Sequence, residues 1–161
     1  MNRFSSMYLS VITSVLSIYY LPKIASLKEK KLIKKEVFSG VITTLPILFI
    51  VSVLIYFFRN QIIAILFSKE FSSMQELFLN QLAGDFLKIA SWLFAIIMLS
   101  KSMTKVYIVS EILFTVFYIG LVYYLTPILG LQGVVLANTL NYTVYIVFAL
   151  FLFFRYLKSI N

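Results

Sequence analysis

The sequence predicts an all-α protein that crosses a membrane several times. Hydrophobic residues make up 61% of its 161 residues, and charged residues only 12%. Soluble domains are about half apolar and about a quarter charged, so the polar residues here are too few to cover a water-soluble core. Disorder is excluded by the same composition, because it goes with low hydrophobicity. At this length we expect one membrane domain.

Five stretches are long enough to cross the hydrocarbon layer, which needs about 20 mostly apolar residues. Backbone groups in hydrocarbon must bond within their own segment, so each stretch is expected to be a helix. Barrel strands would alternate over about 10 residues, and residues 47–51 do not alternate. The expected helices cover residues 5–22, 37–58, 77–100, 106–126 and 131–154.

Basic residues collect in the connections on one side of these helices. Residues 23–36 hold six lysines, residues 101–105 hold two, and the tail adds Arg155 and Lys158. Basic loops stay in the cytoplasm, which predicts a cytoplasmic loop at 23–36, a periplasmic amino terminus and a cytoplasmic carboxyl terminus. Residues 59–76 then lie outside, and their mixture of isoleucines with charges indicates a segment in the membrane interface.

Composition and charge exclude several function classes. Cysteine and histidine are absent, which removes disulfides, thiolate nucleophiles, the usual zinc sites and histidine acid–base catalysis. The six acidic residues are scattered and form no short metal-binding motif. We therefore expect no enzyme, no cofactor and no metal site. The net charge of +8 is explained by topology and attraction to membrane lipids, and no nucleic-acid partner is expected, because no aromatic platform is interleaved with the lysines.

A charged helix face within the third stretch is the strongest sign of function. Residues at i, i+4, i+7 and i+11 share this face: Gln81, Asp85, Lys88 and Trp92. Lys88 falls near mid-membrane, where a charge costs from about 2.5 to more than 10 kcal/mol and usually marks a transport pathway. The alternative is structural, with Asp85 and Lys88 neutralising one another and holding the helix in register.

Polar residues of the later stretches accompany this face. Glu111 lies five residues inside the fourth stretch, where it either reaches the inner interface or turns inward to pair with Lys88. In the fifth stretch, polar residues on one face either line a cavity or pack against a neighbour: Asn138, Asn141, Tyr142 and Tyr145.

Two features of the first and second stretches have more than one interpretation. A hydroxyl stripe in the first stretch is typical of helix–helix packing; it comprises Ser6, Ser10, Thr13 and Ser17. Pro46 predicts a kink in the second stretch, which is either a hinge or a simple bend.

Three short motifs follow one another along the chain. Residues 20–27 read Y-L-P-K-I-A-S-L, residues 67–71 read F-S-K-E-F, and residues 71–88 fit F-x-x-M-x-x-L-F-x-x-Q-L-x-G-D-x-L-K. Residues 107–111 continue the last pattern as Y-I-x-x-E. This ordered set resembles bacterial Wzx-type flippases, in their O-antigen and enterobacterial common antigen members. They form the polysaccharide branch of the MATE-like (MOP) exporter superfamily.

The resemblance implies a flippase that moves an undecaprenyl-pyrophosphate-linked O-antigen-type saccharide across the bacterial inner membrane. Family members have about twelve helices in two lobes that rock against each other, and this chain resembles most of the second lobe. It is therefore expected to be a fragment, with the amino-terminal lobe and glycan polymerase machinery as partners. Two alternatives are open: a MATE-like cation-coupled exporter, and a non-transporting assembly partner of glycan polymerisation.

Such a substrate needs a polar, partly cationic path, because pyrophosphate and sugars cannot cross apolar lipid. We expect Lys88 to attract the pyrophosphate and Asp85 to release Lys88 by taking another partner or a proton. Amide side chains would bond sugar hydroxyls. The predicted path comprises Gln81, Asp85, Lys88, Glu111, Asn138 and Asn141.

Overall fold

A computed structural model of the chain describes residues 2–61 and 77–160. Within these ranges, five helices are long and apolar enough to cross a membrane, and no strand occurs. They are α1 (Asn2–Ser26), α2 (Lys30–Phe57), α4 (Leu77–Ser100), α5 (Thr104–Leu129) and α6 (Leu131–Ser159). The prediction of an all-α, multi-pass membrane protein is confirmed. Most of the expected interfacial segment at 59–76 lies outside the described residues.

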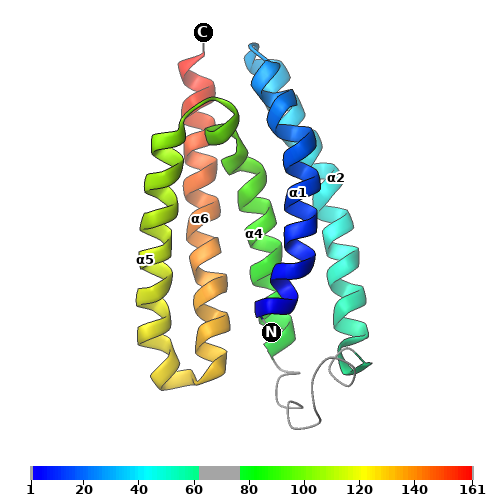
Figure 1. Cartoon of the computed structure of the whole chain (residues 1–161), viewed down its shortest axis with the longest axis vertical. Helices are drawn as coiled ribbons and strands as arrows, with labels where there is room; N and C mark the ends of the chain where they lie inside the picture. The colour runs from blue at the N-terminus through cyan, green and yellow to red at the C-terminus, as the bar shows by residue number, and fades with distance from the viewer. Residues whose placement is uncertain (1, 62–76, 161) are drawn as a thin grey trace.

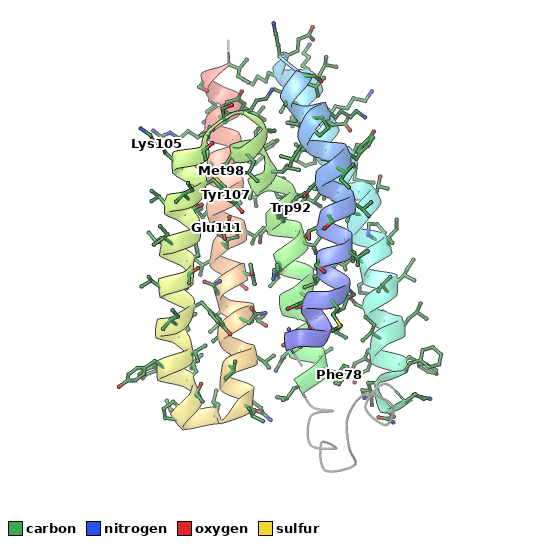
Figure 2. The ribbon with its side chains drawn as sticks, viewed as in Figure 1. Phe78, Trp92, Met98, Lys105, Tyr107 and Glu111 are labelled. Atoms are coloured by element: carbon green, nitrogen blue, oxygen red, sulfur yellow. The ribbon has the colours of Figure 1, made fainter. Side chains whose placement is uncertain are left out.

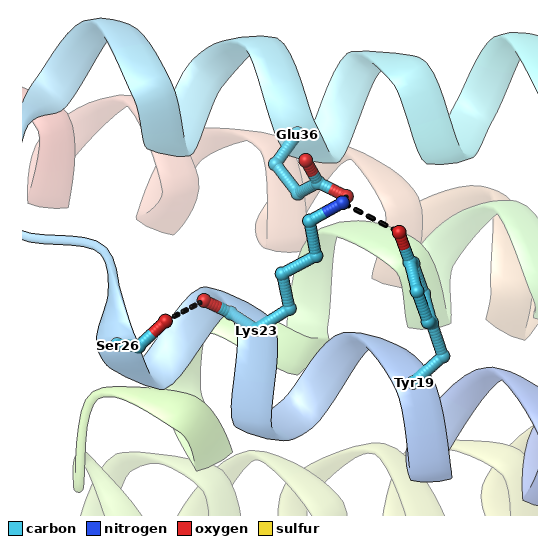
Figure 3. Close-up of polar contacts among 4 residues, drawn as sticks. All are labelled: Tyr19, Lys23, Ser26 and Glu36. Atoms are coloured by element: carbon cyan, nitrogen blue, oxygen red, sulfur yellow. Dashed lines mark hydrogen bonds and ion pairs between the residues drawn. The ribbon is translucent and has the colours of Figure 1, made fainter.

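The helices extend beyond the apolar stretches that predicted them. The expected loop at 23–36 is mostly helical, because α1 continues to Ser26 and α2 begins at Lys30. Hydropathy marks only the part of a helix that sits in hydrocarbon, whereas the backbone bonds continue into the interface, where lysine side chains reach water. There Lys23 of α1 forms an ion pair of 2.8 Å with Glu36 of α2 and donates a hydrogen bond to the Tyr19 hydroxyl (Figure 3).

Helix α2 continues through Pro46 and ends at Phe57. The two threonines before this proline, Thr43 and Thr44, lie in the turn whose backbone bonds a proline disturbs. The hinge role of Pro46 stays a prediction.

Helix α4 occupies the centre of the bundle, with α1 and α2 on one side and α5 and α6 on the other (Figure 1). It packs against all four other helices, most extensively against α6. In the most apolar stretch of α4, 67% is buried inside the chain, compared with 6% in that of α5. Apart from its one polar face, α4 is apolar, and these apolar sides are largely buried against the neighbouring helices. The exposed face of α5 is also apolar, as a lipid-facing surface requires.

Aromatic side chains join the helices in the core near the basic end. The rings of Phe94 and Phe153 lie 5.6 Å apart in an edge-on arrangement, and Phe38 lies 6.1 Å from Phe94. These contacts link α2, α4 and α6. Edge-on aromatic pairs contribute about 0.5–1.5 kcal/mol beyond the apolar area that they bury.

The basic connections gather at one end of the bundle, the end that carries the carboxyl terminus (Figure 1). Lys105 marks this end and Phe78 the opposite one (Figure 2). Ten of the 14 lysine and arginine residues belong to these connections and the tail. Lys101 donates hydrogen bonds to the carbonyls of Ala25, at 3.3 Å, and Leu27, which ties the α4–α5 turn to the end of α1. Burial lowers the pKa of Lys101.

Candidate functional site

A cavity of about 500 Å³ lies between α1, α4, α5 and α6. Its wall includes all six residues predicted for the substrate path: Gln81, Asp85, Lys88, Glu111, Asn138 and Asn141. Trp92, Tyr107 and Glu111 line the part nearer to the basic end (Figure 2). The structure thus brings the predicted residues together, while their role in transport stays a prediction.

Asp85 is the most deeply buried charged residue of the cavity wall, with 2% of its surface exposed. One carboxylate oxygen accepts a hydrogen bond of 2.5 Å from the Tyr8 hydroxyl of α1. The other accepts a bond of 3.0 Å from the Gln81 amide, one turn earlier on α4. A buried carboxylate needs such donors in place of the water that it loses. The contact between Tyr8 and Asp85 also holds α1 against α4.

Glu111 turns toward α6 and does not reach for the basic end of the bundle. Its carboxylate accepts a hydrogen bond of 2.8 Å from the hydroxyl of Tyr145. Tyr145 is buried, and its ring packs edge-on against Phe114 at 4.6 Å. Glu111 itself is exposed within this chain, so the described helices leave the cavity open on that side.

Lys88 pairs with neither carboxylate. No nitrogen–oxygen contact within 4.0 Å joins it to Asp85 or Glu111; in the described part of the chain, the ion pair within that distance is Lys23–Glu36. The Lys88 ammonium instead lies 5.6 Å from the centre of the Tyr142 ring. The interpretation that Asp85 and Lys88 neutralise each other as a direct ion pair is therefore wrong, and so is a direct pairing of Lys88 with Glu111. Each carboxylate instead accepts a hydrogen bond from a tyrosine hydroxyl.

Two buried amide oxygens of the cavity wall lack hydrogen-bond partners within the described residues. They are Oε1 of Gln81 and Oδ1 of Asn141. An unsatisfied buried acceptor costs about 1–3 kcal/mol. Both oxygens are thus disposed to accept hydrogen bonds from a group that enters the cavity.

Gly84 lets α6 come close to α4 beside the cavity. A Cβ atom at this position would lie 2.8 Å from Asn138 Nδ2 and 3.0 Å from Thr139 Oγ1. The Thr139 hydroxyl in turn donates a bond of 3.0 Å to the carbonyl of Asn80. Small residues permit this kind of approach between membrane helices. The contact places the amides of α6 opposite the charged face of α4.

Sequence reasoning missed Tyr8, whose hydroxyl completes the surroundings of Asp85. The sequence signal for Tyr8 was weak, because it consisted only of a tyrosine inside an apolar stretch, close to the hydroxyl stripe. Members of that stripe behave differently: Ser6 and Thr13 line the cavity, whereas Ser10 is exposed and bonds the carbonyl of Met7 in its own helix. The four polar residues of the fifth stretch all line the cavity.

Fold and site together define a multi-pass membrane protein whose apolar helices line a polar cavity that carries charged side chains. The chain is 31% identical over 144 residues to the Lipid III flippase of Escherichia coli (strain K12) and to the Lipid III flippase of Shigella flexneri. This alignment covers 89% of the chain but 35% of each relative, so the chain spans about a third of their length. No model of a known protein family matches, and no solved structure matches.

Proposed function

We propose that these helices form one wall of a flippase that moves a lipid-linked saccharide across the bacterial inner membrane. The observation that carries the proposal is a polar cavity with a lysine free of carboxylate partners at the middle of an apolar helix. A charge at that depth is costly in lipid, so it faces protein or water and usually marks a transport pathway. The similarity to Lipid III flippases supports the same function. The substrate that we favour is an undecaprenyl-pyrophosphate-linked unit of the O-antigen type.

The cavity wall offers a partner for each polar part of such a substrate. Lys88 attracts the pyrophosphate, since its contact with the Tyr142 ring is worth only about 0.5–2 kcal/mol and a phosphate oxygen can replace it. The acceptor oxygens of Gln81 and Asn141 suit sugar hydroxyls. The polyprenyl tail stays in the bilayer, along the apolar outer faces of the helices.

Transport further requires a second helical body that closes the cavity at Glu111, because alternating access depends on two bodies that move against each other. The proposed orientation places the basic end in the cytoplasm. The amino end of α1 then faces the periplasm. Pro46 of α2 is the proposed hinge, and glycan polymerase machinery is a proposed partner.

Replacement of Lys88 tests this function in bacteria that lack their own flippase for a lipid-linked glycan. The protein, expressed as its gene encodes it, should restore surface glycan, and Lys88→Ala should abolish the restoration at an unchanged protein level. Lys88→Arg should keep a substantial part, because it keeps the positive charge. Lys158→Ala is the matched control, since this exposed lysine lies outside the cavity, and it should restore glycan normally.

The accumulation of lipid-linked glycan in the cytoplasmic leaflet provides the second readout. It should rise with Lys88→Ala and stay low with Lys158→Ala. Normal surface glycan with Lys88→Ala would refute the role of this lysine. Failure of the unaltered protein to restore any glycan, together with substrate-stimulated ion flux, would show instead a small-molecule exporter.

A further inference from the structure

Two tyrosine–carboxylate pairs flank Lys88 from different helices. Tyr8 of α1 donates to Asp85 at 2.5 Å, and Tyr145 of α6 donates to Glu111 at 2.8 Å. All four of these residues line the same cavity as Lys88, or contact a residue that does. The lysine thus shares a small space with two acidic groups and pairs with neither.

Electrostatics alone would favour a different arrangement. Opposite charges attract far more strongly in a low-dielectric interior than in water, and Asp85 lies three residues from Lys88 on the same helix. A carboxylate without other donors would therefore turn to the ammonium. In the structure, the two oxygens of Asp85 accept bonds from Tyr8 and Gln81.

We propose that Tyr8 and Tyr145 are positioning residues that hold Asp85 and Glu111 away from Lys88 and so keep the ammonium available to a phosphate group of the substrate. This inference rests on the proposed function and extends it to residues outside the predicted path. Tyrosine suits the task because its hydroxyl is a neutral donor on a rigid ring. It satisfies a carboxylate and adds no competing positive charge.

Removal of either hydroxyl has a specific consequence. In Tyr8→Phe the ring and its packing remain, but Asp85 loses a donor and turns to Lys88. The resulting ion pair must be broken before a pyrophosphate can bind. A second change, Asp85→Asn, removes the negative charge and leaves Lys88 available again. Rescue by this change separates the positioning role from a loss of packing, since the amide cannot repair a packing defect.

The test measures binding of undecaprenyl pyrophosphate to the protein, expressed as its gene encodes it, in lipid nanodiscs. Tyr8→Phe should weaken binding about tenfold, which corresponds to ~1.4 kcal/mol. Tyr8→Phe with Asp85→Asn should return the dissociation constant to within about threefold of the unaltered value, or ~0.7 kcal/mol. Tyr123→Phe is the matched control: this tyrosine is highly exposed and lies outside the cavity, so binding should not change.

Tyr145→Phe and its combination with Glu111→Gln repeat the test on the other carboxylate. The same pattern of loss and rescue is expected, since Tyr145 donates to Glu111. Agreement between the two pairs would support one common role. The proposal would be overturned if Tyr8→Phe and Tyr145→Phe both bound undecaprenyl pyrophosphate normally. It would also be overturned if the double variants bound it no better than the single ones.

Lys88→Gln distinguishes this inference from the proposed function. If Lys88→Gln binds undecaprenyl pyrophosphate normally, the phosphate site itself is refuted and the positioning role falls with it. If Lys88→Gln loses binding while the tyrosine variants keep it, the site stands and only the positioning role is refuted.

Discussion

A methyl group at Gly84 is expected to disturb the contact between α4 and α6 that shapes the cavity. In Gly84→Ala the new Cβ would lie 2.8 Å from Asn138 Nδ2 and 3.0 Å from Thr139 Oγ1. The amide of Asn138 can swing away. Thr139 has less freedom, because its hydroxyl shares its single proton between the carbonyls of Asn80, at 3.0 Å, and Val135, at 3.2 Å.

The expected magnitude is the difference between two opposing effects. Overpacking in a close contact costs about 1–3 kcal/mol. Alanine in place of glycine within a helix gains up to about 1 kcal/mol. Gly84→Ala should therefore lower the free energy of unfolding by about 0–2 kcal/mol.

Gly120 provides the matched control for this comparison. It lies inside α5, and a Cβ there would meet no atom within 4 Å. Gly120→Ala should show only the gain from helix propensity. Thermal or denaturant unfolding in the same detergent should place Gly84→Ala about 1–3 kcal/mol below Gly120→Ala. Equal stability of the two variants would refute the close approach of α6 at Gly84.

Two further substitutions test other contacts by the same unfolding measurement. Gly133→Ala should cost about 3 kcal/mol, the upper end for overpacking, because its Cβ would lie 2.4 Å from the carbonyl oxygen of Leu125 and backbone atoms cannot swing aside; a loss smaller than that of Gly84→Ala would contradict this geometry. Glu36→Gln removes the ion pair with Lys23, whose side chain is 41% exposed, and should cost less than about 1 kcal/mol. A larger loss would show that this pair is a main attachment between α1 and α2.

The features that depend on local sequence could be predicted. Apolar length gave the number of crossings in the described ranges, and helical periodicity placed Gln81, Asp85 and Lys88 on one face. The same reasoning placed Asn138 and Asn141 on a common face of α6. These properties follow from the pitch of a single helix, so they do not depend on how the helices pack.

The partners of the charged residues could not be predicted, because they come from distant parts of the chain. Tyr8 lies 77 positions from Asp85, and Tyr145 lies 34 positions from Glu111. The residues that meet are determined by how the packed helices are rotated and how far apart they lie. Contacts such as the close approach of α6 at Gly84 set this arrangement. From the sequence alone, Lys88 is the one partner that can be named for either carboxylate, and only as an alternative; the other partner expected for Asp85 cannot be identified as a tyrosine on another helix.

The central claim is that Lys88 faces a water-accessible cavity at mid-membrane depth. The 161 residues contain no cysteine, so a single cysteine can report the surroundings of one position in this chain. Val116 is the control, since it lies midway along α5, is 64% exposed and does not line the cavity. In membrane vesicles, Lys88→Cys should react with a charged, water-soluble thiol reagent, and Val116→Cys should not. An unreactive cysteine at position 88, in a protein that is inserted and folded, would contradict the account.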